Sequence, residues 1–82
     1  MNNIEILEKL KIIFKRVIDP NKDFTNIDEN TNIIKDLGVN SVGLIYLLMA
    51  IEEYFDIDMS DVTFNTFEKI EDVVNYIKGN ID

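Results

Sequence analysis

The residues from Asp36 to Phe55 read DLGVNSVGLIYLLMAIEEYF, which sets a tight turn, a serine and a long apolar segment in immediate succession. Gly38 gives the backbone the freedom that a sharp turn into a helix requires. Asn40 and Ser41 are both good N-cap residues, because their side-chain oxygens can accept a hydrogen bond from an unpaired helix N–H group. We therefore expect a helix from Ser41 to Phe55. The serine would lie at the positive end of the helix dipole, where a bonded anion is favoured.

Two further helices are predicted from apolar residues that recur at intervals of three and four. The first runs from Asn3 to Ile18 and ends at Asp19-Pro20, and the last runs from Phe67 to Lys78. The residues between Pro20 and Asn40 read as a long loop, and a short third helix is expected from Ser60 to Phe64. The predicted fold is all-α: one domain, residues 1–82, forming an antiparallel four-helix bundle of three longer helices and one short one. The apolar positions predicted to form the core are Ile6, Leu10, Ile13, Phe14, Val17, Phe24, Ile27, Ile33, Ile34, Leu37, Leu44, Leu47, Leu48, Ile51, Phe55, Phe67, Ile70, Val73, Val74 and Ile77.

The composition narrows the possible functions of these 82 residues. The net charge of −8 disfavours nucleic acid, whose phosphates would repel the chain. No apolar run is long enough for a membrane span, and the first residues lack the pattern of a signal peptide, so we expect a cytoplasmic protein. The chain has neither cysteine nor histidine, and Asp56-x-Asp58-x-Ser60 has Asp61 where a calcium loop needs glycine, so no metal site is predicted.

The residues are poorly suited to catalysis. Ser41 has no histidine to activate it, and the nearest preceding lysine in the sequence is Lys35. The chain also lacks a phosphate-binding glycine motif and a Cys/His cluster with zinc spacing. We therefore expect no catalytic residues and a protein that is not itself an enzyme.

The central helix has more apolar surface than one buried face requires. Between Lys35 and Lys69 there is no basic residue, so this surface lies in an acidic part of the chain. One interpretation is a small core that wraps most of the helix, with acidic residues that are merely solvated. The other is an apolar strip with an acidic end that docks partner proteins. The residues proposed for partner recognition are Val42, Ile45, Tyr46, Met49, Glu52 and Glu53.

LGVNSV followed by an apolar helix and IEEYFDI resembles the modification site of acyl carrier proteins, and the similarity extends over nearly the whole chain. The family pattern is roughly LG-x-D-S-L and then a helix that ends E-x-x-F-x-I. The matching residues are Leu37, Gly38, Ser41, Glu52, Phe55 and Ile57. Asn40 stands where aspartate is usual and Val42 where leucine is usual. Asparagine lacks the negative charge of aspartate, which would weaken recognition by a transferase that reads that charge or shift recognition to a different transferase.

The resemblance implies a 4′-phosphopantetheine arm, transferred from coenzyme A to Ser41 by a phosphopantetheinyl transferase that uses Mg²⁺. Acyl, aminoacyl or polyketide groups would be carried as thioesters to loading, extending and off-loading enzymes with basic docking surfaces, with the carrier acting as a monomer. Tyr46 stands where fatty-acid carriers often have an acidic residue, which favours a carrier of polyketide, peptide or other specialised acyl transfer over fatty acid biosynthesis. The alternative is an unmodified acidic helical adaptor that binds a basic protein partner.

Overall fold

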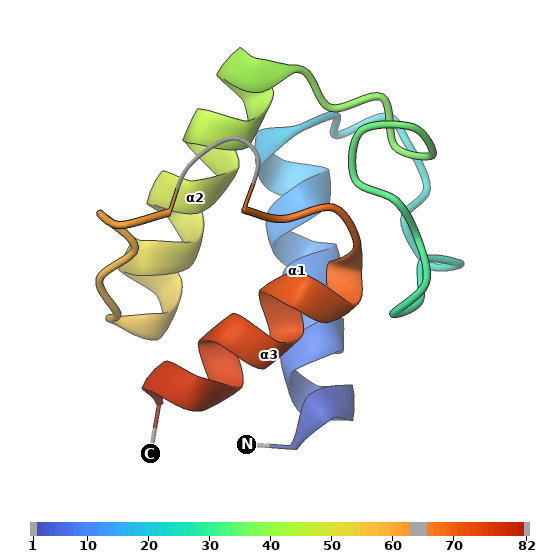
Figure 1. Cartoon of the computed structure of the whole chain (residues 1–82). Coiled ribbons are helices and arrows are strands. Elements are labelled where there is room, and N and C mark those ends of the chain that lie inside the picture. The colour runs from blue at the N-terminus through green and yellow to red at the C-terminus, as the bar shows by residue number, and fades with distance from the viewer. Residues whose placement is uncertain (1, 63–65, 82) are drawn as a thin grey trace.

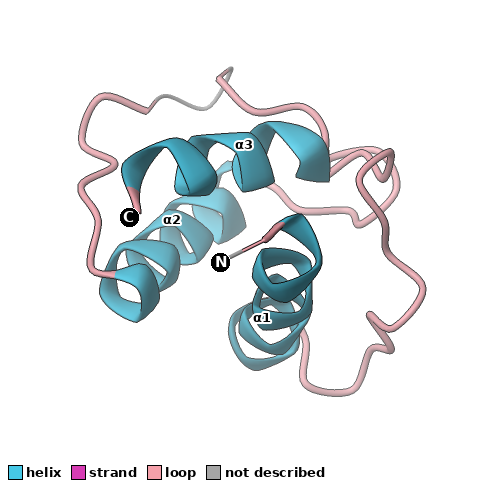
Figure 2. Ribbon diagram, turned by 90° about the horizontal axis from the view of Figure 1, so that it is seen from below, coloured by secondary structure: helices cyan, strands magenta, loops and turns pink. Residues whose placement is uncertain are grey.

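The computed structural model describes residues 2–62 and 66–81, and within them it contains three helices and no strand. These are α1 (Asn3–Val17), α2 (Ser41–Phe55) and α3 (Ile70–Asn80). In Figure 1, α1 and α2 stand side by side and run in opposite directions, while α3 lies across them. Figure 2, which looks from below, shows α3 lying crosswise on one side of the pair formed by α1 and α2. The antiparallel arrangement predicted for the bundle therefore holds for α1 and α2, whereas α3 crosses this pair.

At the start of the two amphipathic helices, α1 and α3, side chains accept hydrogen bonds from some of the backbone N–H groups. Asn2 caps α1, where its Oδ1 accepts from Glu5 N at 2.8 Å and the Glu5 carboxylate accepts from Asn2 N at 3.5 Å. In α3 the carboxylate of Asp72 accepts from the backbone N–H groups of Glu68 and Lys69, each at 3.0 Å. These bonds replace the intrahelical partners that the first turn of any helix lacks.

The core lies where the three helices meet and is closed on one side by the segment between α1 and α2. The apolar residues predicted for α1, α2 and α3 are buried or half-buried, and those of α3 are all buried. In the connecting segment Phe24 packs against Phe14 with 5.9 Å between ring centroids. Ile34 departs from the prediction, since it remains 36% exposed while Ile33 beside it is fully buried.

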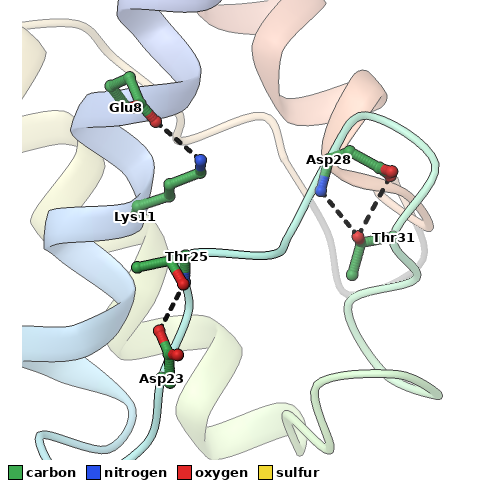
Figure 3. Close-up of polar contacts among 6 residues, drawn as sticks. All are labelled: Glu8, Lys11, Asp23, Thr25, Asp28 and Thr31. Atoms are coloured by element: carbon green, nitrogen blue, oxygen red, sulfur yellow. Dashed lines mark hydrogen bonds and ion pairs between the residues drawn. The ribbon is translucent and has the colours of Figure 1, made fainter.

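Residues 18–40 contain turns and no helix, and backbone bonds attach them to the start of α3. Ile33 N donates to Glu68 O and Ile70 N donates to Thr31 O, each at 2.9 Å, on either side of an antiparallel bridge between Asn32 and Lys69. Local bonds shape the rest of this segment. Figure 3 shows Thr25 held by Asp23 and Asp28 held by Thr31, beside the 2.8 Å ion pair of Lys11 with Glu8 on α1.

The predicted helix boundaries are correct for α2 and differ slightly for the other two helices. α1 ends at Val17, one residue early, with Ile18 as its C-cap. α3 begins at Ile70 instead of Phe67, because Lys69, which forms the bridge to Asn32, has an extended backbone and is the N-cap of the helix. It also continues past Lys78, through Gly79 to Asn80.

The short helix expected at Ser60–Phe64 is not confirmed. Ser60 and Asp61 form a turn, whereas Thr63 and Phe64 lie outside the described residues. None of the helices within the described ranges is both long and apolar enough to cross a membrane.

Candidate functional site

The site is the N-terminal end of α2, where a tight turn delivers the chain to the helix. Gly38 has a φ of 68°, a left-handed conformation that glycine adopts without strain. Val39 then turns inward and is 3% exposed, which fixes the turn to the core. Asn40 is extended (φ −90°, ψ 179°) and is the N-cap of α2. Its Oδ1 accepts from Gly43 N at 2.7 Å and its carbonyl accepts from Leu44 N at 2.9 Å.

Ser41 is the first residue of α2, and its side chain is exposed. Because Asn40 provides the cap, the Ser41 hydroxyl makes no hydrogen bond with the residues that the structure describes. The backbone N–H groups of Ser41 and Val42 likewise have no acceptor within the described ranges. The site therefore presents an unbonded hydroxyl next to two unpaired N–H donors at the positive end of a helix dipole.

The first turn of α2 differs from those of the other two helices in its charge. α1 has Glu5 in its first turn and α3 has Glu71 and Asp72, whereas α2 has no acidic residue there. A negative charge attached near Ser41 would therefore be stabilised by the dipole of α2, and no carboxylate in the same turn would repel it.

Gly43 lies close against the residue that caps α2, a role that the sequence pattern left undecided. A Cβ at this position would lie 3.4 Å from Val39 Cγ1 and 3.8 Å from Ile18 Cδ1, and 3.3 Å from the capping oxygen of Asn40. The tightest of these contacts is with the capping oxygen, so the missing side chain leaves room for the bond between Asn40 and Gly43.

The four apolar residues predicted to recognise partners form an exposed strip along α2. Val42, Ile45, Tyr46 and Met49 are each between 57% and 58% exposed. This exposure rules out a core that wraps most of the helix. The role of the strip in recognition stays a prediction.

The two acidic residues at the far end of α2 differ from each other. Glu53 is exposed, whereas Glu52 is half-buried and its carboxylate accepts from Met59 N at 2.8 Å. Glu52 therefore also holds the turn that follows α2, which the sequence reading did not foresee.

A groove of about 450 Å³ lies between α1 and α2. Tyr54 forms one side, and its ring centroid lies 5.6 Å from Lys9 Nζ. The groove was not predictable from the sequence, because its lining residues come together only when α1 packs against α2. Its lining residues are Ile12, Ile13, Arg16, Val17, Ala50, Glu53 and Tyr54.

Possible metal ligands are not clustered in the described part of the chain. There, no group of three or more histidine, cysteine, aspartate or glutamate residues is placed to hold a metal ion.

Comparison with known proteins agrees with this geometry. The family model described as "Phosphopantetheine attachment site" matches residues 8–77. The acyl carrier protein of Phytoplasma australiense is 34% identical over 76 residues, which cover 93% of this chain and 97% of the relative. The acyl carrier protein of Campylobacter lari is 36% identical over 74 residues, covering 90% and 94%. That of Clostridium acetobutylicum is 42% identical over 60 residues, covering 73% and 78%. Both the family match and these relatives span most of the chain, which therefore belongs to the acyl carrier protein family, with phosphopantetheine as its cofactor.

Proposed function

We propose that Ser41 is the residue that carries the 4′-phosphopantetheine arm and that this chain transports acyl, aminoacyl or polyketide intermediates as thioesters. The observation that carries the proposal is the exposed Ser41 hydroxyl, which the described residues leave without a hydrogen bond at the start of α2. The family match to phosphopantetheine attachment supplies the cofactor.

The residues around Ser41 suit the phosphate end of such an arm. The N–H groups of Ser41 and Val42 are available as donors within the described part of the chain, and the first turn of α2 has no carboxylate. A phosphodiester on Ser41 Oγ would lie at the positive end of the dipole of α2, which favours an anion by about 0.3–1 kcal/mol at an exposed position.

The attachment reaction requires only a nucleophilic oxygen from this chain. Ser41 Oγ attacks the phosphorus that bears the pantetheine chain in coenzyme A and forms a new P–O bond. The P–O bond to the second phosphate breaks, and 3′,5′-ADP leaves with that electron pair. The serine proton goes to a base of the transferase, because this chain contains no histidine. Once attached, the arm supplies a thiol that bears the cargo, so the carrier itself performs no catalysis.

The exposed strip on α2 suits repeated encounters with enzymes of basic surface. Val42, Ile45, Tyr46 and Met49 offer apolar contact area next to Ser41, and Glu53 adds charge further along the same helix. Opposite charge on the partner would speed the encounter, while the apolar residues would contribute contact area in the complex. The partners in this proposal are a phosphopantetheinyl transferase and the enzymes that load, extend and release the cargo, acting on a single carrier domain.

Intact-mass measurement tests the proposal. Incubation with coenzyme A, Mg²⁺ and a broad-specificity phosphopantetheinyl transferase is expected to add one phosphopantetheine to the wild-type chain and none to Ser41→Ala. An unchanged wild-type mass with several transferases would contradict the proposed function. A protein complex that is sensitive to salt but indifferent to Ser41→Ala would favour the unmodified adaptor instead.

A further inference from the structure

The sequence offers two successive residues, Asn40 and Ser41, that could each cap α2. Asparagine and serine have similar preferences for the N-cap position. If Ser41 were the cap, it would adopt an extended backbone, and its Oγ would accept from Leu44 N, the N–H group three residues on. The helix would then start one residue later, and the hydroxyl would be held against the backbone. The structure has the other arrangement, in which Leu44 N donates to the carbonyl of Asn40.

One side-chain bond caps the observed start of α2. α1 has a reciprocal pair at its start, since Asn2 Oδ1 accepts from Glu5 N and the Glu5 carboxylate accepts from Asn2 N. α2 has only the first half of such a pair, because Gly43 occupies the position of Glu5 and has no side chain to return the bond. Glycine also weakens a helix relative to alanine, so the first turn of α2 depends strongly on its cap.

We propose that Asn40 is a positioning residue for the modification of Ser41. By accepting from Gly43 N at 2.7 Å, its side chain makes Ser41 the first helical residue and leaves the serine hydroxyl unbonded and exposed. The inference rests on the proposed function, since it assigns Asn40 a role in the attachment reaction. It also accounts for the asparagine that replaces the usual aspartate: both side chains offer an oxygen acceptor, and only the charge differs.

The test compares two losses of the same kind. Asn40→Ala removes the cap of α2, and Asn2→Ala removes the cap of α1, which forms a bond of similar length at 2.8 Å. Both variants lose a helix cap and are expected to be less stable. Only Asn40→Ala should move the Cα and Cβ chemical shifts of Ser41 from helical toward extended values, and only it should speed hydrogen exchange at the Gly43 amide. Losing a cap of this kind typically changes the balance between the two arrangements about fivefold to tenfold.

Kinetics of modification supply the second measurement. At a temperature where every variant is folded, kcat/KM for the transferase is expected to fall about fivefold for Asn40→Ala and to stay unchanged for Asn2→Ala. Asn40→Asp restores the acceptor and should return the Ser41 shifts to wild-type values. If Asn40→Ala does not fold, Asn40→Gly removes the same acceptor at a smaller cost to the helix.

Unchanged Ser41 shifts in Asn40→Ala, or a modification rate equal to that of Asn2→Ala, would overturn the role assigned to Asn40. A wild-type chain that accepts no arm would instead contradict the proposed function. In that case the shifts of Ser41 would still decide whether Asn40 controls the position of the serine.

Discussion

The phenol of Tyr76 on α3 donates a hydrogen bond of 2.7 Å to Oδ1 of Asp61, in the segment that follows α2. A second acceptor, the carbonyl of Asp58, lies 3.2 Å from the same oxygen. The Tyr76 ring meets the ring of Phe67 edge-on with 5.6 Å between centroids. Tyr76 thereby attaches α3 to chain segments on both sides of residues 63–65.

Tyr76→Phe is expected to lower the midpoint of thermal unfolding by a few degrees, because it removes a hydrogen bond to a charged acceptor and keeps the ring contact. Tyr46→Phe serves as the control, since the Tyr46 hydroxyl has no hydrogen-bond partner within the described residues. Circular dichroism on heating measures both. Equal midpoints for the two variants would mean that the bond to Asp61 contributes nothing to stability.

The same bond makes stability depend on alkaline pH. The hydrogen bond to Asp61, followed by desolvation and the nearby carboxylates, raises the pKa of Tyr76 above its ordinary value. A raised pKa in the folded state means that the protonated phenol is favoured by folding. This contribution is complete below about pH 10, the ordinary tyrosine pKa, and is lost as the pH rises through the higher folded value. Denaturant titrations should therefore show a smaller alkaline loss of stability in Tyr76→Phe than in the wild type.

Asp72 is expected to stabilise the start of α3. Asp72→Ala removes the acceptor for the N–H groups of Glu68 and Lys69 and should cost about 1 kcal/mol, the usual effect of losing a helix cap. Glu71→Ala is the matched control, because it removes the same charge from the same turn and its side chain is exposed. Chemical denaturation measures both. A loss for Glu71→Ala as large as that for Asp72→Ala would attribute the effect to charge alone.

The stability that Asp72 contributes to the folded protein should decrease in acid. The backbone bonds from Lys69 and Glu68 hold the pKa of Asp72 below its ordinary value. The stability that these bonds provide is present above about pH 4, the ordinary pKa of aspartate, and disappears as the pH falls through the lower folded value. The difference in stability between wild type and Asp72→Ala should narrow over that range. A constant difference down to the lowest pH at which the protein folds would contradict this account.

The parts of the fold that depend on local sequence were predictable. The capping residues and the apolar run from Val42 define α2 at both ends, and the apolar stripe of α1 is buried where its spacing predicts. The start of α3 was not predictable, because it is set by backbone bonds to residues that are distant in the sequence, from Ile33 N to Glu68 O and from Ile70 N to Thr31 O.

The position of Ser41 at the start of α2 was predictable, whereas the capping arrangement around it was not. The similar capping preferences of asparagine and serine left open which residue caps α2. The two glutamates at the end of α2 also look alike in sequence. Only the three-dimensional contacts separate Glu52, which accepts from Met59 N, from the exposed Glu53.

Glu53, the exposed one of the two glutamates, is the residue with which to test whether the end of α2 docks partner proteins. Glu53→Lys should raise the KM of the transferase several-fold at low salt and leave the helix content unchanged, because it reverses an exposed charge next to the apolar strip. The effect should shrink as salt is added, since salt screens exposed charges. Glu71→Lys on α3 makes the same charge change away from α2 and should leave KM unaltered. A KM for Glu53→Lys equal to that of Glu71→Lys at low salt would contradict a docking role for the end of α2.

The central claim is that the Ser41 hydroxyl carries the arm, and fragmentation mass spectrometry of the modified protein tests it most directly. After reaction with coenzyme A, Mg²⁺ and the transferase, a single phosphopantetheine should be found on the peptide that contains Ser41. The control Ser60→Ala should gain the same group on the same peptide. Phosphopantetheine on a peptide without residue 41, or its attachment to Ser41→Ala, would contradict the account.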